Sequence, residues 1–237
     1  MMKTTLFLLV TVIVILGCGT PKSDNSESTL NEVIDQSLGD NVDKFTGKLD
    51  ELLTLEIAAD ALGYDAAKAE KEYSQVLKSP KTHSVIYEWD MGKMTEIKLP
   101  GLNHSVTAPQ RDRIGLSWLQ GITEEQFQQQ YRTPTQEELK RADEAMKAKM
   151  DEMVAEGKIN ADQAKMGQGM ASGFGAGLSF SDIDGVGKKA KWNNKNQELL
   201  VFTKGIMFQI RVVTEDSEEI KKQKSIKAAQ RILQERL

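Results

Sequence analysis

Residues 198–212 read ELLVFTKGIMFQIRV, and this stretch decides the fold. Two runs rich in β-branched and aromatic residues flank Lys204-Gly205, a two-residue connection typical of a tight β-hairpin. Side chains alternate between the two faces of a strand, so one face of this hairpin is predicted to be apolar. The predicted core face consists of Leu199, Val201, Ile206, Phe208, Ile210 and Val212.

Helices are predicted on both sides of the hairpin in the sequence. Residues 218–237 are acidic at their start and basic near their end, as the helix dipole favours. Residues 29–62 form the N-terminal helical region, in which Thr54 caps a helix that stops at Gly63. A further helical piece is predicted over residues 66–77. The last helix has its apolar stripe at Ile226, Ala229, Leu233 and Leu237.

The middle of the chain alternates between strand and helix signals. Period-two patterns predict strands at residues 84–90, 94–99 and 114–119. A capping box at Thr123 opens a short helix to Tyr131. A second box, Thr133 to Gln136, opens a helix that stops at Gly157, and another helix follows over residues 160–167. Glycine dominates residues 167–187, so low order is expected there.

Together these signals predict an α+β fold. An antiparallel sheet is packed by N- and C-terminal helices and carries a helical-hairpin and Gly-rich insertion. The predicted organisation is a single α+β domain over residues 29–237, with the insertion at about 133–180.

The start of the chain has the layout of a secretory signal peptide over residues 1–17. Lys3 precedes an apolar run at residues 6–16, which is shorter than the ~20 residues that a membrane-spanning helix needs. Residues 15–18, ILGC, resemble the bacterial lipobox. The resemblance implies cleavage before Cys18, lipid on its thiol and acylation of the new amino terminus. Because Leu16 is unusual at its position, an ordinary signal peptide is the alternative.

Residues 18–28 are predicted to be a lipidated flexible tether, because after Cys18 they are small and polar. We therefore expect an exported protein that is lipid-anchored to a bacterial membrane. Gly19 stands where an Asp would suggest retention in the inner membrane, which favours the periplasmic face of the outer membrane in a Gram-negative host.

Charge and cysteine usage limit the chemistry. The net charge of −4 becomes −5 once Lys3 is removed, which argues against nucleic acid as a partner. Cys18 is the only cysteine, so its lipidation leaves no thiol for a disulfide, catalysis or a metal site.

Other chemical motifs are weak, so no catalytic residue, metal or cofactor is predicted. His83 and His104, the only histidines, lie in turn-like contexts without ligands at helical spacing. Residues 182–185, DIDG, lack the glutamate that would complete a calcium loop. Gly185-Val186-Gly187 precedes a strand and not the helix of a phosphate loop, so both motifs are interpreted as a tight corner.

Half of the ten methionines lie in the predicted helical hairpin: Met146, Met150, Met153, Met166 and Met170. We favour the interpretation that they pack the two helices on each other. The alternatives are an adaptable face for a protein partner and a copper(I) site, since thioethers suit both.

Three segments resemble a known group of domains. These are residues 52–63 ahead of the strand with Tyr87 and Trp89, residues 183–192 (IDGVGKKAKW) ahead of the hairpin, and the closing helix. They resemble small α+β domains of bacterial lipoproteins of unknown function, similar in shape to the PsbP/Mog1-like fold. The resemblance covers about residues 50–130 and 180–237 and implies a fold but no activity. Many of those domains carry a cysteine pair, which this chain lacks.

These observations lead to a functional hypothesis. The expected protein is a membrane-anchored bacterial lipoprotein that acts as a non-catalytic binding or assembly module of the cell envelope. Its expected partners are the membrane, through the lipid anchor, and an envelope protein. The alternative is an uncharacterised envelope enzyme, a hydrolase whose catalytic residues the sequence does not mark. A third possibility is that the Gly/Met/Phe segment enters a bilayer.

Overall fold

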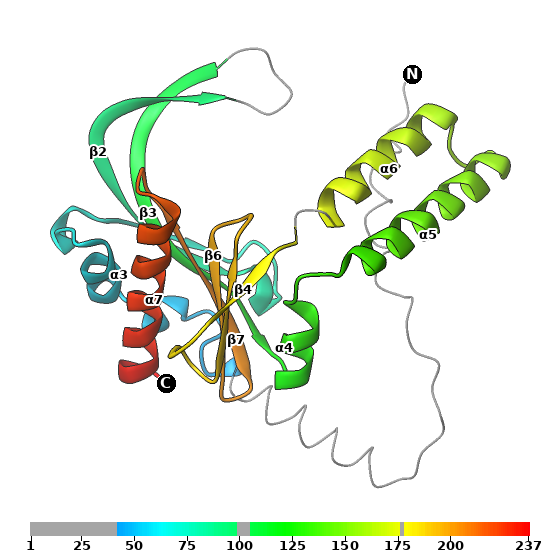
Figure 1. Cartoon of the computed structure of the whole chain (residues 1–237). Helices are drawn as coiled ribbons and strands as arrows, with labels where there is room; N and C mark the ends of the chain where they lie inside the picture. The colour runs from blue at the N-terminus through cyan, green and yellow to red at the C-terminus, as the bar shows by residue number, and fades with distance from the viewer. Residues whose placement is uncertain (1–41, 99–104, 176–177) are drawn as a thin grey trace, which may run out of the picture. The chain divides into compact units, whose positions relative to one another are not determined.

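Seven strands form one antiparallel sheet in the computed structural model, which describes residues 42–98, 105–175 and 178–237 (Figure 1). All neighbouring strands are antiparallel, so the predicted α+β class with an antiparallel sheet is confirmed. In sheet order the strands are β1 (Glu70–Ser74), β2 (Ser84–Lys98), β3 (Ser105–Gly121), β7 (Ile206–Val213), β6 (Glu198–Thr203), β5 (Lys189–Asn193) and β4 (Phe180–Ile183).

The β6–β7 hairpin has the predicted turn and register. Lys204 and Gly205 have φ of 48° and 76°, as a two-residue turn with the right-handed strand twist requires. Val201 pairs with Phe208 and Leu199 with Ile210. All six residues of the predicted core face are at most 2% exposed and belong to the main hydrophobic cluster.

Helices α2 (Leu49–Leu52), α3 (Leu55–Leu62) and α7 (Glu218–Glu235) supply the buried apolar side chains that meet this face. Helix α3 begins at the N-cap Thr54 and ends at Gly63, as predicted. Helices α3 and α7 lie side by side (Figure 1). The predicted stripe of α7 is rotated, because the helix buries Ser225, Ala228, Ala229 and Ile232, whereas Ile226, Leu233 and Leu237 are half-buried.

The other face of the sheet carries a second, smaller cluster. Helix α4 (Glu124–Gln130) opens with the predicted capping box at Thr123. Its Phe127 is fully buried and stacks on Phe202 of β6, with ring centroids 5.6 Å apart. Ile122, Leu200 and Met207 complete this cluster.

The predicted helical hairpin consists of α5 (Gln136–Ala155) and α6 (Ala161–Gly175), which contact each other. The capping box lies two residues later than predicted, because Thr135 and not Thr133 caps α5 and pairs with Glu138. Helix α6 continues to Gly175 and β4 begins at Phe180, so helix and strand extend into the stretch for which low order is expected. Helix α6 contacts α5, and β4 pairs with β5.

Two sequence predictions before and within the sheet are corrected. Residues 66–77 are not a helix, because a short 3-10 turn, η1 (Ala66–Lys68), is followed by β1, which pairs along β2. The strands predicted at 84–90 and 94–99 are one strand, β2, with an irregularity between Asp90 and Met94. Its partner β3 begins at Ser105, well before the predicted start. The predicted signal peptide and tether, including Cys18, lie outside the described residues.

Candidate functional site

Large apolar side chains are exposed together at one end of the sheet. Val76 and Leu77, in the connection from β1 to β2, are 84% and 59% exposed, and Trp118 near the end of β3 is 48% exposed. Lys78 and Lys81 lie in the same connection and are exposed. We call these five residues the Trp118 surface.

A β-bulge turns Trp118 away from the core. In regular alternation Trp118 would share the core face of β3 with Ile114 and Leu116, both fully buried. The pairing of β3 with β7 shifts between Ser117 and Gln120, and after this shift Leu119 occupies the core instead. The backbone of Trp118 has φ of 55°, which is rare for a bulky side chain and costs about 1–3 kcal/mol. The bulge therefore exposes a tryptophan side chain that a regular strand would bury.

The loop with Val76 and Leu77 is fastened next to this bulge. The carbonyl of Leu77 lies 2.8 Å from Nε2 of His83, which donates to it. Ser84, the next residue, pairs with Ser117. The short helix η2 (Pro80–Thr82) lies against β3. These contacts bring Leu77 and Trp118 to the same end of the β2–β3 hairpin.

The sequence places His83 in a turn-like context. In the structure its side chain is almost fully buried, at 6% exposure. Its Nε2 holds the Leu77 carbonyl, whereas its Nδ1 is buried and has no hydrogen-bond partner among the described residues. In this arrangement the imidazole fixes the loop in place. The other histidine, His104, lies outside the described residues.

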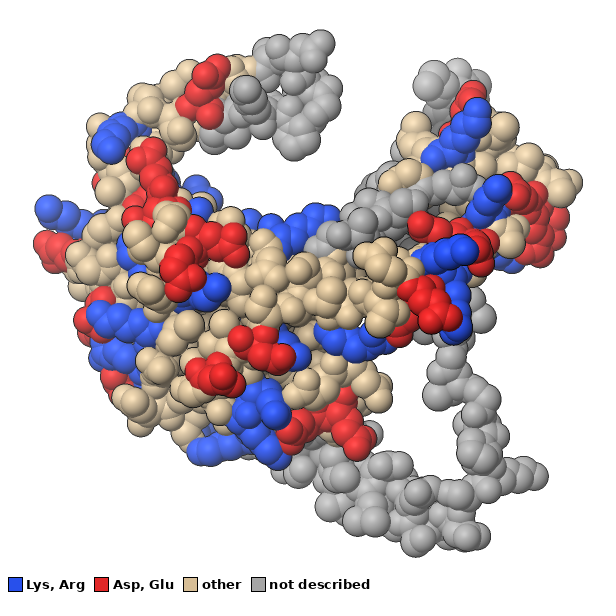
Figure 2. Space-filling model, in the orientation of Figure 1, with Lys and Arg blue, Asp and Glu red and all other residues tan. Residues whose placement is uncertain are grey.

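Basic groups flank the apolar side chains. Residues 75–83 contain Lys78 and Lys81 and no Asp or Glu, and within the described part of the chain neither lysine forms an ion pair. The acidic residues of the adjacent helix α2 are engaged elsewhere, since Asp50 pairs with Lys71 at 2.9 Å and Glu51 with Lys48 at 3.8 Å. Across the visible face of the molecule, by contrast, acidic and basic side chains are interspersed (Figure 2).

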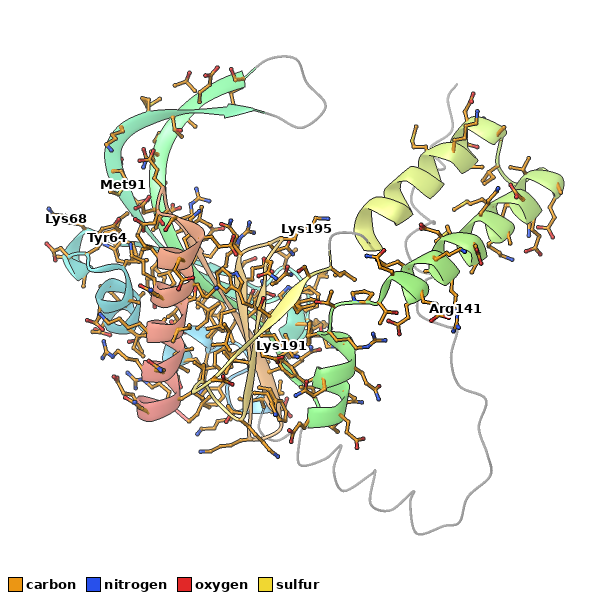
Figure 3. All side chains as sticks on the ribbon, in the orientation of Figure 1. Tyr64, Lys68, Met91, Arg141, Lys191 and Lys195 are labelled. Atoms are coloured by element: carbon orange, nitrogen blue, oxygen red, sulfur yellow. The ribbon has the colours of Figure 1, made fainter. Side chains whose placement is uncertain are left out.

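The predicted tight corner between β4 and β5 lines a polar cavity of about 310 Å³, together with Gln128 of α4. Gly185 and Gly187 have φ of 75° and 59°, as a corner requires. Asp182 pairs with Lys191 at 2.7 Å (Figure 3 marks Lys191). Lys188 pairs with Glu124 at 2.6 Å and lowers the pKa of that carboxyl. Three of the charged groups that line this cavity, Asp182, Lys188 and Lys191, are thus engaged in ion pairs, which fits a structural corner.

The methionines do not form one uniform face. Met150 is buried and lies against Gly167 of α6, where an added Cβ would come within 2.9 Å of the Met150 Cε. Met146 and Met153 are half-buried, Met166 is 68% exposed, and the side chain of Met170 is outside the description. Met150 therefore packs the two helices together, as the favoured interpretation holds.

A polar network lies at the base of the β2–β3 hairpin. The hydroxyl of Tyr64, a residue labelled in Figure 3, donates to the carboxylate of Asp112, and burial raises the pKa of Tyr64. Trp89 donates to the Asp65 carbonyl at 2.9 Å, and its ring lies 5.6 Å from that of Tyr64. These bonds join η1 and α3 to the sheet.

Sequence reasoning missed the Trp118 surface. Two signals could have indicated it. Trp118 and Leu119 are consecutive large apolar residues in an alternating strand, which suggests a bulge. Val76-Leu77-Lys78 is an apolar pair in a polar connection, which the incorrect helix prediction placed at the end of a helix.

Comparison with known proteins finds no matching family model, no similar curated protein and no similar solved structure. The resemblance to PsbP/Mog1-like lipoprotein domains stays a prediction. Among the described residues, no helix has the length and apolar character to cross a membrane. Nor does this part of the chain group three or more His, Cys, Asp or Glu side chains closely enough to hold a metal ion.

Proposed function

We propose that this protein is a bacterial lipoprotein, exported and held on a membrane through lipids on Cys18, that acts as a non-catalytic binding or assembly module of the cell envelope. We further propose that it binds through the Trp118 surface. The signal-like residues 1–17 and the lipobox-like residues 15–18 support the anchoring. The outward-turned Trp118 supports the binding role.

The single observation that carries the binding role is the strained bulge at Trp118. A regular strand would bury this side chain, whereas the observed backbone accepts a positive φ and exposes it. Strained conformations of this kind concentrate at functional positions. Tryptophan is also one of the residue types enriched among energetically dominant binding contacts. Val76 and Leu77 extend the same apolar area, which distinguishes it from a single exposed residue.

Site-specific photo-crosslinking in living bacteria tests this proposal. A photoreactive amino acid replaces Trp118 in the full chain, and a matched control replaces Ile220 of α7, which is similarly exposed at 42%. We expect light-dependent adducts from position 118 that are absent from position 220. Equal adducts at both positions, or none at 118, would refute binding through this surface.

A further inference from the structure

We infer that the Trp118 surface docks on the anionic phospholipid surface to which the lipid tether is fastened. This inference rests on the proposed function and names the partner of the same surface. In the docked state the β1–β2 connection and the bulge of β3 face the headgroups.

The composition of the surface matches a membrane interface better than a protein interface. Tryptophan prefers the headgroup level, where its ring is partly apolar and its N–H remains hydrated. Val76 and Leu77 can enter the acyl boundary, while Lys78 and Lys81 beside them attract anionic headgroups. Lysine, by contrast, is depleted from the centres of protein interfaces. Two lysines that form no ion pair with any described residue lie next to the apolar residues, and this composition favours lipid.

The position of the N-terminal segment points to the same partner. The described chain begins at Val42, and Val42 and Phe45 are already buried in the core. A Cβ added to Gly47 would lie 3.2 Å from Nε2 of Gln75, the residue before Val76. The described N-terminal segment therefore passes close to Gln75, at the edge of the Trp118 surface.

The local charge balance supports this orientation. In the N-terminal segment and β1, the acidic residues Asp43, Asp50, Glu51 and Glu72 stand beside the basic residues Lys44, Lys48 and Lys71, and Asp50 pairs with Lys71 and Glu51 with Lys48. The β1–β2 connection, residues 75–83, contains Lys78 and Lys81 and no acidic residue, so this connection itself is positively charged.

The tether makes weak docking sufficient. Fully extended at ~3.5 Å per residue, the chain between Cys18 and Val42 reaches roughly 80 Å at most. The surface is thus held close to the membrane at a high effective concentration, so a small apolar area with two lysines can keep it docked.

Tryptophan quenching by brominated lipids in reconstituted vesicles tests the inference. The full acylated protein is placed in vesicles of phosphatidylethanolamine and phosphatidylglycerol with bromine on their acyl chains. Trp89 and Trp192 are at most 4% exposed and serve as shielded references. We expect quenching of the Trp118 emission, which Trp118→Tyr removes.

Matched variants separate docking from mere tethering. Val76→Asp with Leu77→Asp should abolish the quenching, whereas Ile220→Asp on α7 should leave it unchanged. Lys78→Glu with Lys81→Glu should weaken it, as should high salt. Circular dichroism of each variant establishes that the fold is retained.

Two results would overturn the lipid assignment. The first is absence of quenching in the unmodified protein, and the second is equal quenching in the Val76→Asp, Leu77→Asp variant. If position 118 nevertheless crosslinks to an envelope protein in cells, the proposed binding function stands and only its lipid partner is wrong. If neither lipid nor protein is captured, both proposals fail.

Discussion

Gly185 and Gly187 both have positive φ in the β4–β5 corner, but only Gly187 lies against another strand. A Cβ added to Gly187 would come within 2.8 Å of the carbonyl oxygen of Phe202, whereas one added to Gly185 would meet nothing within 4 Å. The backbone atoms of Phe202 cannot move aside without disturbing β6. At the scale of single residues, close approach therefore explains one glycine and turn geometry alone explains the other.

This contrast predicts different costs for the same substitution. Gly185→Ala should lower the free energy of unfolding by about 1 kcal/mol, the usual penalty of a left-handed backbone for an L-residue. Gly187→Ala should cost roughly 2–4 kcal/mol, because the contact with Phe202 adds to that penalty. Urea unfolding of both variants measures the difference, and equal costs would show that β6 yields to the added methyl.

Glu198 offers a second prediction at this scale. Its carboxyl is buried at the start of β6, and burial raises its pKa, although Arg211 and hydrogen bonds from Asn196 and Gln209 partly offset this. A raised pKa in the folded state means that stability falls as pH rises from below the ordinary glutamate range through the folded pKa. Glu198→Gln should therefore raise the melting temperature at pH 7, and the gain should shrink at pH 4. Thermal unfolding at the two pH values checks this. A variant that is less stable at pH 7 would show that attraction to Arg211 outweighs burial.

The α5–α6 pair shows what decides structure at the scale of elements. The start of α5 is specified locally, because Glu138 accepts hydrogen bonds from Arg132 at 2.5 and 2.7 Å and from the Thr135 backbone at 2.9 Å. The pKa of Glu138 is lowered to about 2, chiefly by the hydrogen bond from the Arg132 guanidinium and next by the hydrogen bond from the Thr135 backbone. The two helices then meet where Met150 lies on Gly167.

Met150→Ala should loosen this pair. Removing a buried methionine side chain usually costs about 2–5 kcal/mol. We expect a cost of about 2 kcal/mol here, because Met150 packs on a single helix. The loss should appear as faster amide hydrogen exchange within α5 and α6, with β6 and β7 unaffected. Met166→Ala is the control, since Met166 is 68% exposed. Equal exchange in the two variants would contradict packing through Met150.

At the scale of the whole molecule, helix α7, near the C-terminal end of the described chain, packs against helix α3, near its N-terminal end. Lys227 and Arg231 of α7 reach Asp60 of α3 at 3.0 and 3.3 Å. Such surface ion pairs contribute little, about 0–1 kcal/mol each. The buried side chains beneath them, Ala228, Ala229 and Ile232, therefore hold the helices on the sheet. The residues of this core that the structure describes run from Val42 to Ile232.

The anchor and the fold should therefore be separable. Mass spectrometry of the mature protein should find Cys18 as a lipid-modified first residue. Cys18→Ser should abolish lipidation and release the protein from membrane fractions, while its melting temperature stays unchanged. An unmodified Cys18 within the mature protein would contradict the lipoprotein proposal, whatever the outcome at the Trp118 surface.

Sequence patterns by themselves determined the features that depend on near neighbours. The turn at Lys204-Gly205, its alternating core face, and the helix starts at Thr54 and Thr123 involve residues only a few positions apart. Periodicity and capping report such contacts directly. The α+β class follows from them, because an apolar strand face and an apolar helix stripe must cover each other.

Only the tertiary structure decided β1 and the Trp118 surface. Residues 70–74 are polar enough for a helix or a loop and become a strand because the edge of β2 accepts their backbone hydrogen bonds. Regular alternation would make Trp118 a core residue, but the shift in pairing between β3 and β7 turns its side chain outward. Both outcomes depend on strands that are distant in the sequence, and local propensity carries no information about such partners.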